Sequence, residues 1–231
     1  MEPLSRKKRR IYFYTFSLVF LIVIPIVILY AQGFRFTRNW QILETGGVYV
    51  TSNESESRVY IGGELEKITG VLTRGVFKQN LKPGHYSVEV GKVGYFPSVA
   101  DIVVRENFVT EFDALLIPVV PTFVSLEKRT STYAGVSSLF EGKVSTTTTN
   151  ILLQNAVVKS VSQGKEVSSI FNYPGRTDAL VFALGGGVFV VQPTDERNIF
   201  PLYQGKQKVE VRVFGKAIYI KEGDSIVRFE Q

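Results

Sequence analysis

Histidine and cysteine, two side chains often used in acid–base and nucleophilic chemistry, are nearly absent from this chain. The 231 residues contain one histidine, His85, and no cysteine. His85 follows a Pro-Gly pair on the polar side of a predicted strand, and no second His or Cys is present to share a metal ion with it. The chain also lacks the Gly-x-Ser-x-Gly motif that presents a serine nucleophile. We therefore interpret His85 as an exposed surface residue.

Carboxylates are the remaining candidates for catalysis. Asp178, Asp195, Glu196 and Asp224 could supply the pair of acids of a glycosidase, which must lie roughly 5–9 Å apart in a cleft. No motif in the sequence indicates such a pair. We predict that the protein is not an enzyme and has no catalytic, cofactor-binding or metal-binding residues and no cofactor. A carboxylate-based polysaccharide hydrolase is the less favoured reading.

Two further segments offer weak ligand-binding patterns. Asn53, Glu54 and Glu56 present oxygen ligands suited to calcium, but two carboxylates fall short of a full coordination shell. Gly185-Gly186-Gly187 lies between two apolar segments and lacks the Lys-Ser/Thr of a phosphate-binding loop. We predict a solvated loop at the first segment and a hairpin turn at the second.

The positive charge of the chain is concentrated at its N-terminus. The net charge is +6, but residues 6–10 are all cations opposed only by Glu2, which leaves +2 for the rest of the chain. No large basic face remains, so we predict no nucleic-acid partner. An apolar content of 45% predicts a packed core. The absence of disulfides in an exported domain favours a bacterial source.

Residues 11–31 form the longest apolar segment and predict a transmembrane helix. These 21 residues carry no charge and would span roughly 31 Å as a helix. Pro25 predicts a kink, since lipid-embedded helices tolerate proline. Aromatic residues stand near both ends of the segment, which is typical of membrane interfaces. They are Tyr12 and Tyr14 on one side and Tyr30, Phe34, Phe36 and Trp40 on the other.

The flanking charges predict the orientation of this helix. Five cations precede it and only Arg35 and Arg38 follow closely, so residues 1–10 should form a cytoplasmic tail. A cleaved signal peptide ending at Ala31 is the alternative. It is less favoured because Leu29 is bulky where a small residue is preferred, and because the apolar region exceeds the usual length of about 7–15 residues. We predict an uncleaved anchor, a juxtamembrane segment at 32–45 and an extracytoplasmic C-terminal region.

Residues 46–118 predict a first outer domain of about seven short antiparallel strands. Apolar and polar residues alternate, and Gly or Pro-Gly pairs separate the alternating segments, as at Lys82-Pro83-Gly84. In the segment 85–90, Tyr86, Val88 and Val90 share one face, which predicts one buried side and one wet side. The expected strands are 47–51, 58–61, 77–81, 85–90, 94–97, 100–104 and 108–117.

The same segments resemble a known family. The residues Val48-Tyr49-Val50-Thr51-Ser52, Val59-Tyr60-Ile61-Gly62-Gly63, Leu81-Lys82-Pro83-Gly84-His85-Tyr86-Ser87-Val88 and Gly94-Tyr95 are similar to the PEGA domain of bacterial and archaeal surface proteins. The chain departs from the family at Asn53-Glu54-Ser55-Glu56-Ser57, where the eponymous Pro-Glu-Gly-Ala motif should stand. The resemblance implies a small β-sandwich and a role at the cell surface, without a defined ligand or catalytic residues.

Beyond residue 118 the pattern first weakens and then returns. We predict a linker or irregular segment at 119–150, containing the polar run Ser145-Thr146-Thr147-Thr148-Thr149. A C-terminal domain of β-hairpins should occupy 151–231, with strands at 180–184, 188–192, 209–214, 217–221 and 226–229. Residues 178–205 and 213–224 resemble β-propeller blades, but the remaining chain is too short for a closed propeller.

These features predict a mainly β, single-pass protein of the cell membrane with a non-catalytic binding or structural role at the envelope. Its expected partners are the lipid bilayer through residues 11–31 and an envelope polymer, glycan or protein. Tyr95, Phe96 and Tyr173 are candidate contacts and equally candidates for the core. The alternative is an accessory subunit of a membrane complex, in which the helix and Pro25 pack against partner helices.

Overall fold

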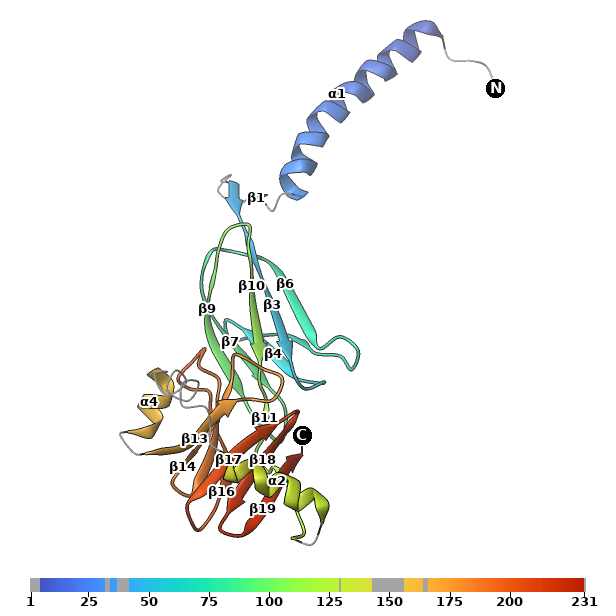
Figure 1. Cartoon of the computed structure of the whole chain (residues 1–231). Coiled ribbons are helices and arrows are strands. Elements are labelled where there is room, and N and C mark those ends of the chain that lie inside the picture. The colour runs from blue at the N-terminus through green and yellow to red at the C-terminus, as the bar shows by residue number, and fades with distance from the viewer. Residues whose placement is uncertain are drawn as a thin grey trace. The chain divides into compact units, whose positions relative to one another are not determined.

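The computed structural model describes residues 5–31, 34–36, 42–128, 130–142, 156–163 and 166–230. Over these ranges the protein is mainly β, with several small sheets and one N-terminal apolar helix, which confirms the predicted fold class (Figure 1). Contacts divide the chain into two units. The first comprises residues 1–50, 77–86 and 102–112, and the second comprises residues 51–76, 87–101 and 113–231.

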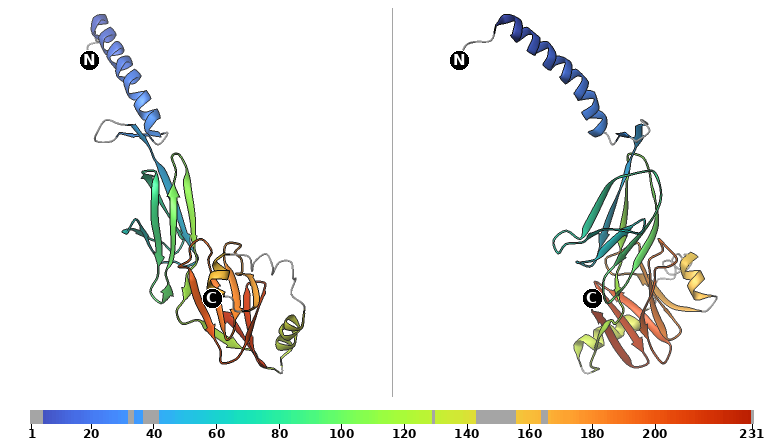
Figure 2. Two further views of the ribbon diagram at one scale, coloured as in Figure 1. Left: turned by 90° about the vertical axis from the view of Figure 1, so that its left-hand side faces the viewer. Right: turned by 180° about the vertical axis from the view of Figure 1, so that it is seen from behind.

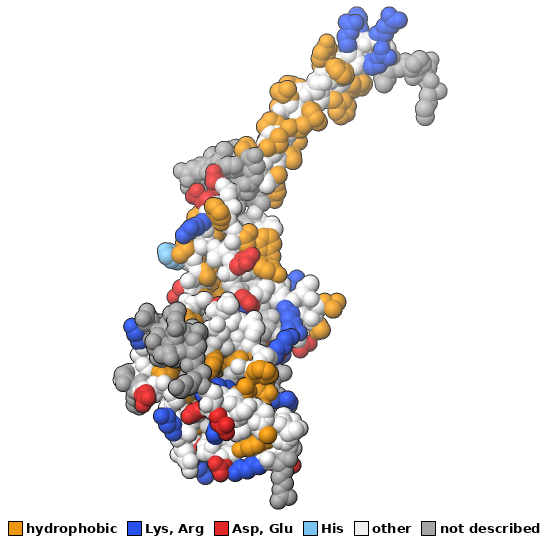
Figure 3. All heavy atoms as spheres, viewed as in Figure 1, with side chains coloured by type: hydrophobic (Ala, Val, Ile, Leu, Met, Phe, Trp, Pro, Cys, Tyr) orange, Lys and Arg blue, Asp and Glu red, His pale blue; other side chains and the backbone are white. Residues whose placement is uncertain are grey.

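The N-terminal helix, α1 (Arg6–Ala31), is continuous over 26 residues. It begins at Arg6 rather than at Ile11 because Lys and Arg are good helix formers that extend the apolar span by more than one turn. Pro25 lies inside the helix without ending it. Cations gather at its N-terminal end and hydrophobic side chains follow along its length (Figure 3). By length and composition α1 is able to cross a membrane.

The predicted juxtamembrane segment contains a small antiparallel sheet. It is formed by β1 (Phe34–Phe36) and β2 (Ile42–Glu44). Arg38 and Trp40, which entered the predictions of orientation and of the aromatic belt, lie outside the described residues.

Nine strands occupy the region predicted as the first outer domain. They are β3 (Gly46–Ser52), β4 (Arg58–Ile61), β5 (Glu64–Ile68), β6 (Gly75–Leu81), β7 (Gly84–Gly91), β8 (Tyr95–Phe96), β9 (Ser98–Val104), β10 (Val109–Ala114) and β11 (Ile117–Pro118). They form sheets in the orders β10-β3-β6, β5-β4-β7-β9 and β11-β8. Figure 2 shows the strands of this region, in blue to green, from two further sides. On β7, Val88 and Val90 are buried while His85, Ser87 and Glu89 are exposed, as the alternation predicts.

Two segments of this region differ from the prediction. The sequence pattern misses β5, since three of its five residues are charged and the whole strand lies at the edge of its sheet. The predicted strand 108–117 is divided into β10 and β11. It is interrupted where Leu116 bonds through its backbone to the side chain of Asn53 instead of to a neighbouring strand.

Two four-stranded antiparallel sheets make up most of the C-terminal half. One has the order β13-β14-β15-β16 and the other β12-β19-β18-β17. Their strands are β12 (Thr122–Ser125), β13 (Val167–Asn172), β14 (Leu180–Leu184), β15 (Gly187–Val191), β16 (Ile199–Gln204), β17 (Val209–Phe214), β18 (Ala217–Glu222) and β19 (Ser225–Glu230). The hairpins predicted around residues 185–187 and 215–216 are both present.

One hydrophobic core is shared by these two sheets. Val181 and Ala183 of β14 enter it from one sheet, and Ile218 and Ile220 of β18 from the other. Leu115, next to the end of β10, belongs to the same core. The segment that follows β10 is therefore packed into the C-terminal sheets rather than connected to them by an extended linker.

Two helices cover the outer faces of these sheets. Helix α4 (Ala156–Ser162) packs Val158 against Phe182, and α2 (Ser131–Glu141) packs Phe140 in a cluster with Tyr219 and Ile226. Both α2 and β12 fall within 119–150, where the sequence predicted a linker or irregular segment. Few apolar residues are needed for a helix that packs along one narrow stripe, which is why the hydrophobic pattern weakens there. The run Ser145–Thr149 lies outside the described residues.

Candidate functional site

Three of the four carboxylates singled out from the sequence, Asp178, Asp195 and Asp224, are each paired with a separate cation. Asp178 accepts hydrogen bonds from Arg176 at 2.9 and 2.6 Å and from the Gln192 amide at 2.9 Å. Burial by itself would raise the pKa of Asp178, but the hydrogen bonds and charge of Arg176 outweigh it and hold the pKa below its usual value. A carboxyl group in this state does not have the raised pKa of a general acid.

Asp195 and Asp224 also form ion pairs, although the Asp195 side chain is 11% exposed and that of Asp224 is 89% exposed. Asp195 pairs with Arg197 at 2.6 Å, and this hydrogen bond lowers its pKa. Asp224 pairs with Lys128 at 3.0 Å, which likewise lowers its pKa. Glu196 is exposed. Among the described residues, Asp178, Asp195 and Asp224 therefore belong to three separate ion pairs.

The other residues considered from the sequence lie at the surface, in a turn or in the packed interior. His85 is exposed at the start of β7, as predicted. Gly185 adopts a φ of +60° in the turn between β14 and β15, which confirms the hairpin. Phe96 stacks on Phe200 at 6.0 Å, and Tyr173 is buried in the core, where burial raises its pKa. Over the described parts of the chain, no group of three His, Asp or Glu side chains is placed to hold a metal ion.

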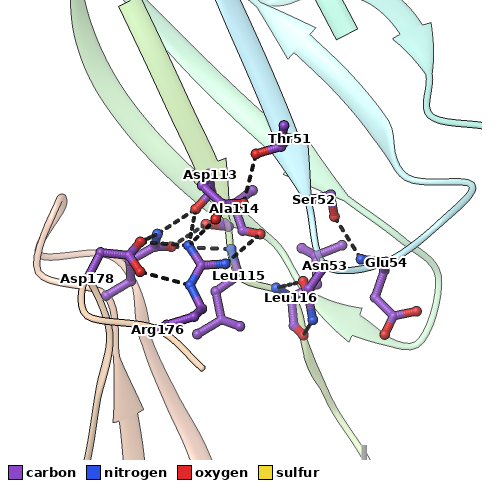
Figure 4. A network of polar contacts seen from close by, with 12 residues as sticks. Thr51, Ser52, Asn53, Glu54, Asp113, Ala114, Leu115, Leu116, Arg176 and Asp178 are labelled. Carbon is purple, nitrogen blue, oxygen red and sulfur yellow. Dashed lines mark hydrogen bonds and ion pairs between the residues drawn. The ribbon is translucent and has the colours of Figure 1, made fainter. Parts of the chain in front are cut away.

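Arg176 is the centre of a polar junction between the end of β10 and the C-terminal sheets. Its guanidinium donates to the carbonyl oxygen of Asp113 at 2.6 Å as well as to Asp178, and it lies 3.2 Å from the Asp113 carboxylate. Gln192 completes the junction by donating to the same carbonyl at 2.7 Å. Figure 4 shows Arg176 pointing toward Asp178 and the backbone at Ala114. These contacts fix the segment 113–116 against the C-terminal sheets.

The loop that follows β3 lies beside this junction and is held by its own polar contacts. The Asn53 side chain donates to the carbonyl oxygen of Leu116 at 3.0 Å and accepts from its N–H at 2.7 Å (Figure 4). Ser57 binds Thr69 through two hydrogen bonds of 2.9 and 2.8 Å. The solvated loop predicted at Asn53, Glu54 and Glu56 is thus only partly exposed: Glu56 is exposed, but Asn53 and Glu54 are half-buried and the Asn53 amide is used within the protein.

A solvent-open hollow of about 740 Å³ lies next to this loop and is the candidate functional site. Its lining comes from three parts of the second unit: the loop after β3, the residue before β6, and the hairpin and strand β17–β19. The lining residues are Asn53, Glu54, Arg74, Lys216, Ala217, Arg228 and Phe229. Its volume falls within the range of about 300–1,000 Å³ that is typical of ligand sites.

The local sequence explains how the cations reach the hollow. Gly215, with a φ of +59°, and Lys216 form the two-residue turn between β17 and β18, so Lys216 stands at an exposed hairpin tip. Arg74 directly precedes β6, and its carbonyl oxygen accepts from the N–H of Ser52 at 3.1 Å. Arg228 is half-buried on β19, opposite Val124 of β12.

The lining of the hollow is positively charged. It contains three cations, Arg74, Lys216 and Arg228, and one carboxylate, Glu54. The Glu54 carboxylate forms a salt bridge of 2.8 Å with Lys92, a residue outside the lining, and this hydrogen bond raises the pKa of Lys92. Arg74 and Lys216 form no ion pair with any carboxylate in the described part of the chain. The arrangement can attract and hold an anion.

Sequence reasoning did not select these cations. Arg74 is more than one hundred positions away from Lys216 and Arg228 in the chain, and it lies near them only because β17–β19 fold beside the loop after β3. The isolated Lys and Arg of a hairpin tip or strand end carry no motif. No family model matches the chain, and no curated protein matches it either.

Proposed function

We propose that the protein is a membrane-anchored, extracytoplasmic β-domain protein of the bacterial cell envelope with a non-catalytic binding role. The observation that carries this proposal is α1. Its 21 residues from Ile11 to Ala31 are uncharged, it is long enough to cross a bilayer, and five cations precede it. A helix of this composition has no buried side chain in the described structure, and lipid is the environment that it suits.

The charge distribution gives the orientation in this proposal. Cations are retained on the cytoplasmic side, so residues 6–10 remain inside and the β-sheets lie outside. The resemblance of residues 46–118 to PEGA domains supports a surface location. The cationic hollow supports a binding role, since it is a concave site whose charge is not balanced within its lining.

Protease accessibility on intact cells tests the location. The full chain carries an epitope tag at its C-terminus, and a second version carries the tag at its N-terminus. We expect externally added protease to remove the C-terminal tag while the N-terminal tag stays protected until the cells are lysed, and the untreated membrane-bound product to have the mass of the uncleaved chain. Protection of the C-terminal tag on intact cells would contradict the proposal.

A pull-down with the detergent-solubilised full chain tests the binding role. Polymer, glycan and protein fractions of the envelope are passed over the immobilised chain at several salt concentrations. The proposal predicts specific retention of one of them, also after residues 11–31 are exchanged for an unrelated membrane helix. Loss of retention on that exchange would instead favour an accessory subunit that assembles through α1.

A further inference from the structure

We propose that the hollow lined by Arg74, Lys216 and Arg228 binds a segment of an anionic polymer through its phosphate or carboxylate groups. This inference rests on the proposed function, for which it supplies the class of ligand. All described residues of the lining of the hollow belong to the second unit.

Charge is the first argument for an anionic ligand. Glu54 is the only carboxylate among the described residues of the lining, and the ammonium group of Lys92 lies 2.8 Å from it. The side chain of Glu54 is only 20% exposed, so this carboxylate is largely occupied by its own partner. The cations at Arg74 and Lys216 are exposed and are opposed by no described carboxylate. A concave site with cations of this kind concentrates anions.

The hydrogen-bonding groups of the lining point to the same class. Asn53 supplies the one neutral polar side chain among the described residues of the lining, and its amide is committed to the backbone of Leu116. Arg74 donates from one terminal nitrogen to the carbonyl oxygen of Asn53 at 2.9 Å, and a guanidinium has five N–H donors in all. The remaining donors are charged, and charged donors bind phosphate and carboxylate oxygens more strongly than neutral ones.

The shape of the site favours a polymer segment over an enclosed small molecule. The hollow is open to solvent, and its cations come from loop, turn and strand positions around it. The exposed cations Arg74 and Lys216 suit a short stretch of repeating anionic units, whose further units can lie outside the hollow. Beyond residues 1–10 the chain carries only +2, which is too little for the extended phosphate contacts of a nucleic-acid duplex.

Polymer binding to the full chain in zwitterionic nanodiscs tests the inference. The probes are poly(glycerol phosphate), polygalacturonate and neutral dextran, so that phosphate and carboxylate ligands are told apart. Lys216→Glu and Arg74→Glu are compared with Lys208→Glu, an exposed lysine outside the hollow that gives the same change of charge. A parallel series has residues 6–10 replaced by glutamine, so that polymer bound by that basic cluster is counted separately.

We expect one of the two anionic polymers to bind and dextran not to bind. Lys216→Glu and Arg74→Glu should each weaken binding by about tenfold or more, whereas Lys208→Glu should change it by less than about threefold. Unfolding midpoints close to that of the wild type show that the variants are folded. Raising the salt concentration from about 50 mM to about 500 mM should weaken the wild-type interaction.

Three results would overturn the inference: no binding of either polyanion, equal weakening by Lys208→Glu, or full binding by both hollow variants. These failures are distinguishable from failure of the proposed function. If envelope fractions are still retained by Lys216→Glu and Arg74→Glu at wild-type levels, the protein binds the envelope at another surface.

Discussion

Arg176 and the cations of the hollow lie in the same unit and differ in how their charge is used. The Arg176 side chain is only 11% exposed and is surrounded by the carboxylates of Asp178 and Asp113 and by backbone carbonyls. Arg74 and Lys216 are exposed and face one carboxylate that already has its own cation. Both regions are polar, but only the hollow contains exposed cations that are not paired with a described carboxylate and can bind an anionic ligand.

The comparison separates a structural role from a binding role by local charge balance. A cation with compensating acceptors on all sides holds segments together, and removing it leaves those acceptors unpaired. A cation in a hollow without compensation costs the fold little to remove. The two regions should therefore respond to mutation in opposite ways, one in stability and the other in affinity.

Arg176→Ala should give the largest effect on stability. It leaves the Asp178 carboxylate and the carbonyl oxygen of Asp113 without their guanidinium, and we expect a loss of about 3 kcal/mol in the free energy of unfolding. The change is measured by urea unfolding monitored by far-UV circular dichroism. Polyanion binding, measured on the folded variant, should stay within about threefold of the wild type.

Arg197→Ala is the matched control for this change. Arg197 also lies between two aspartates, Asp195 at 2.6 Å and Asp101 at 3.0 Å, but its side chain is 52% exposed. Ion pairs made by an exposed cation contribute little, so we expect a much smaller loss of unfolding free energy than for Arg176→Ala. Equal losses for the two arginines would show that burial of the junction is not what gives Arg176 its importance.

Asn53→Ala should have an intermediate effect, and it sharpens the comparison because Asn53 lines the hollow. Its side chain satisfies both backbone groups of the buried Leu116, so we expect a loss of about 2 kcal/mol in unfolding free energy with little change in polyanion affinity. Thr51→Val, which removes one exposed hydrogen bond of 2.8 Å to Asp113, serves as the control and should cost less than about 1 kcal/mol. A selective loss of affinity in Asn53→Ala would assign the amide to the ligand instead.

Much of the fold could be predicted from local sequence, because the signals are local. The alternation at residues 85–90 predicts β7, and the triple glycine at 185–187 predicts the turn between β14 and β15. The apolar run from Ile11 predicts α1, although its start at Arg6 depends on the helix propensity of the basic residues. Each of these elements is specified by neighbours within a few residues.

The rest depends on contacts between distant segments. Strand β12 pairs with β19 about one hundred residues later, and nothing in Thr122–Ser125 indicates that partner. The same limit applies to the site. Arg74 and Lys216 carry no motif, and Arg176 is distinguished from Arg197 only by burial that the tertiary structure supplies.

The smallest expected effect is that of pH. It should change the stability given by the Arg176 junction but not the polyanion binding of the hollow. The pKa of Asp178 is lowered in the folded protein, so its contribution to stability is present above the unfolded pKa of about 3.9 and is lost as the pH falls through the folded pKa. Unfolding midpoints in urea should therefore decrease below about pH 4, and the decrease should be shallower in Asp178→Asn. A residual slope remains, because the pKa of Asp195 is lowered as well.

At pH 5, where the junction is intact and Lys and Arg side chains are charged, polyanion binding should equal that at pH 7. A decrease in binding between pH 7 and pH 5 with unchanged stability would show that a group titrating in that range, rather than the permanent cations of the hollow, holds the ligand.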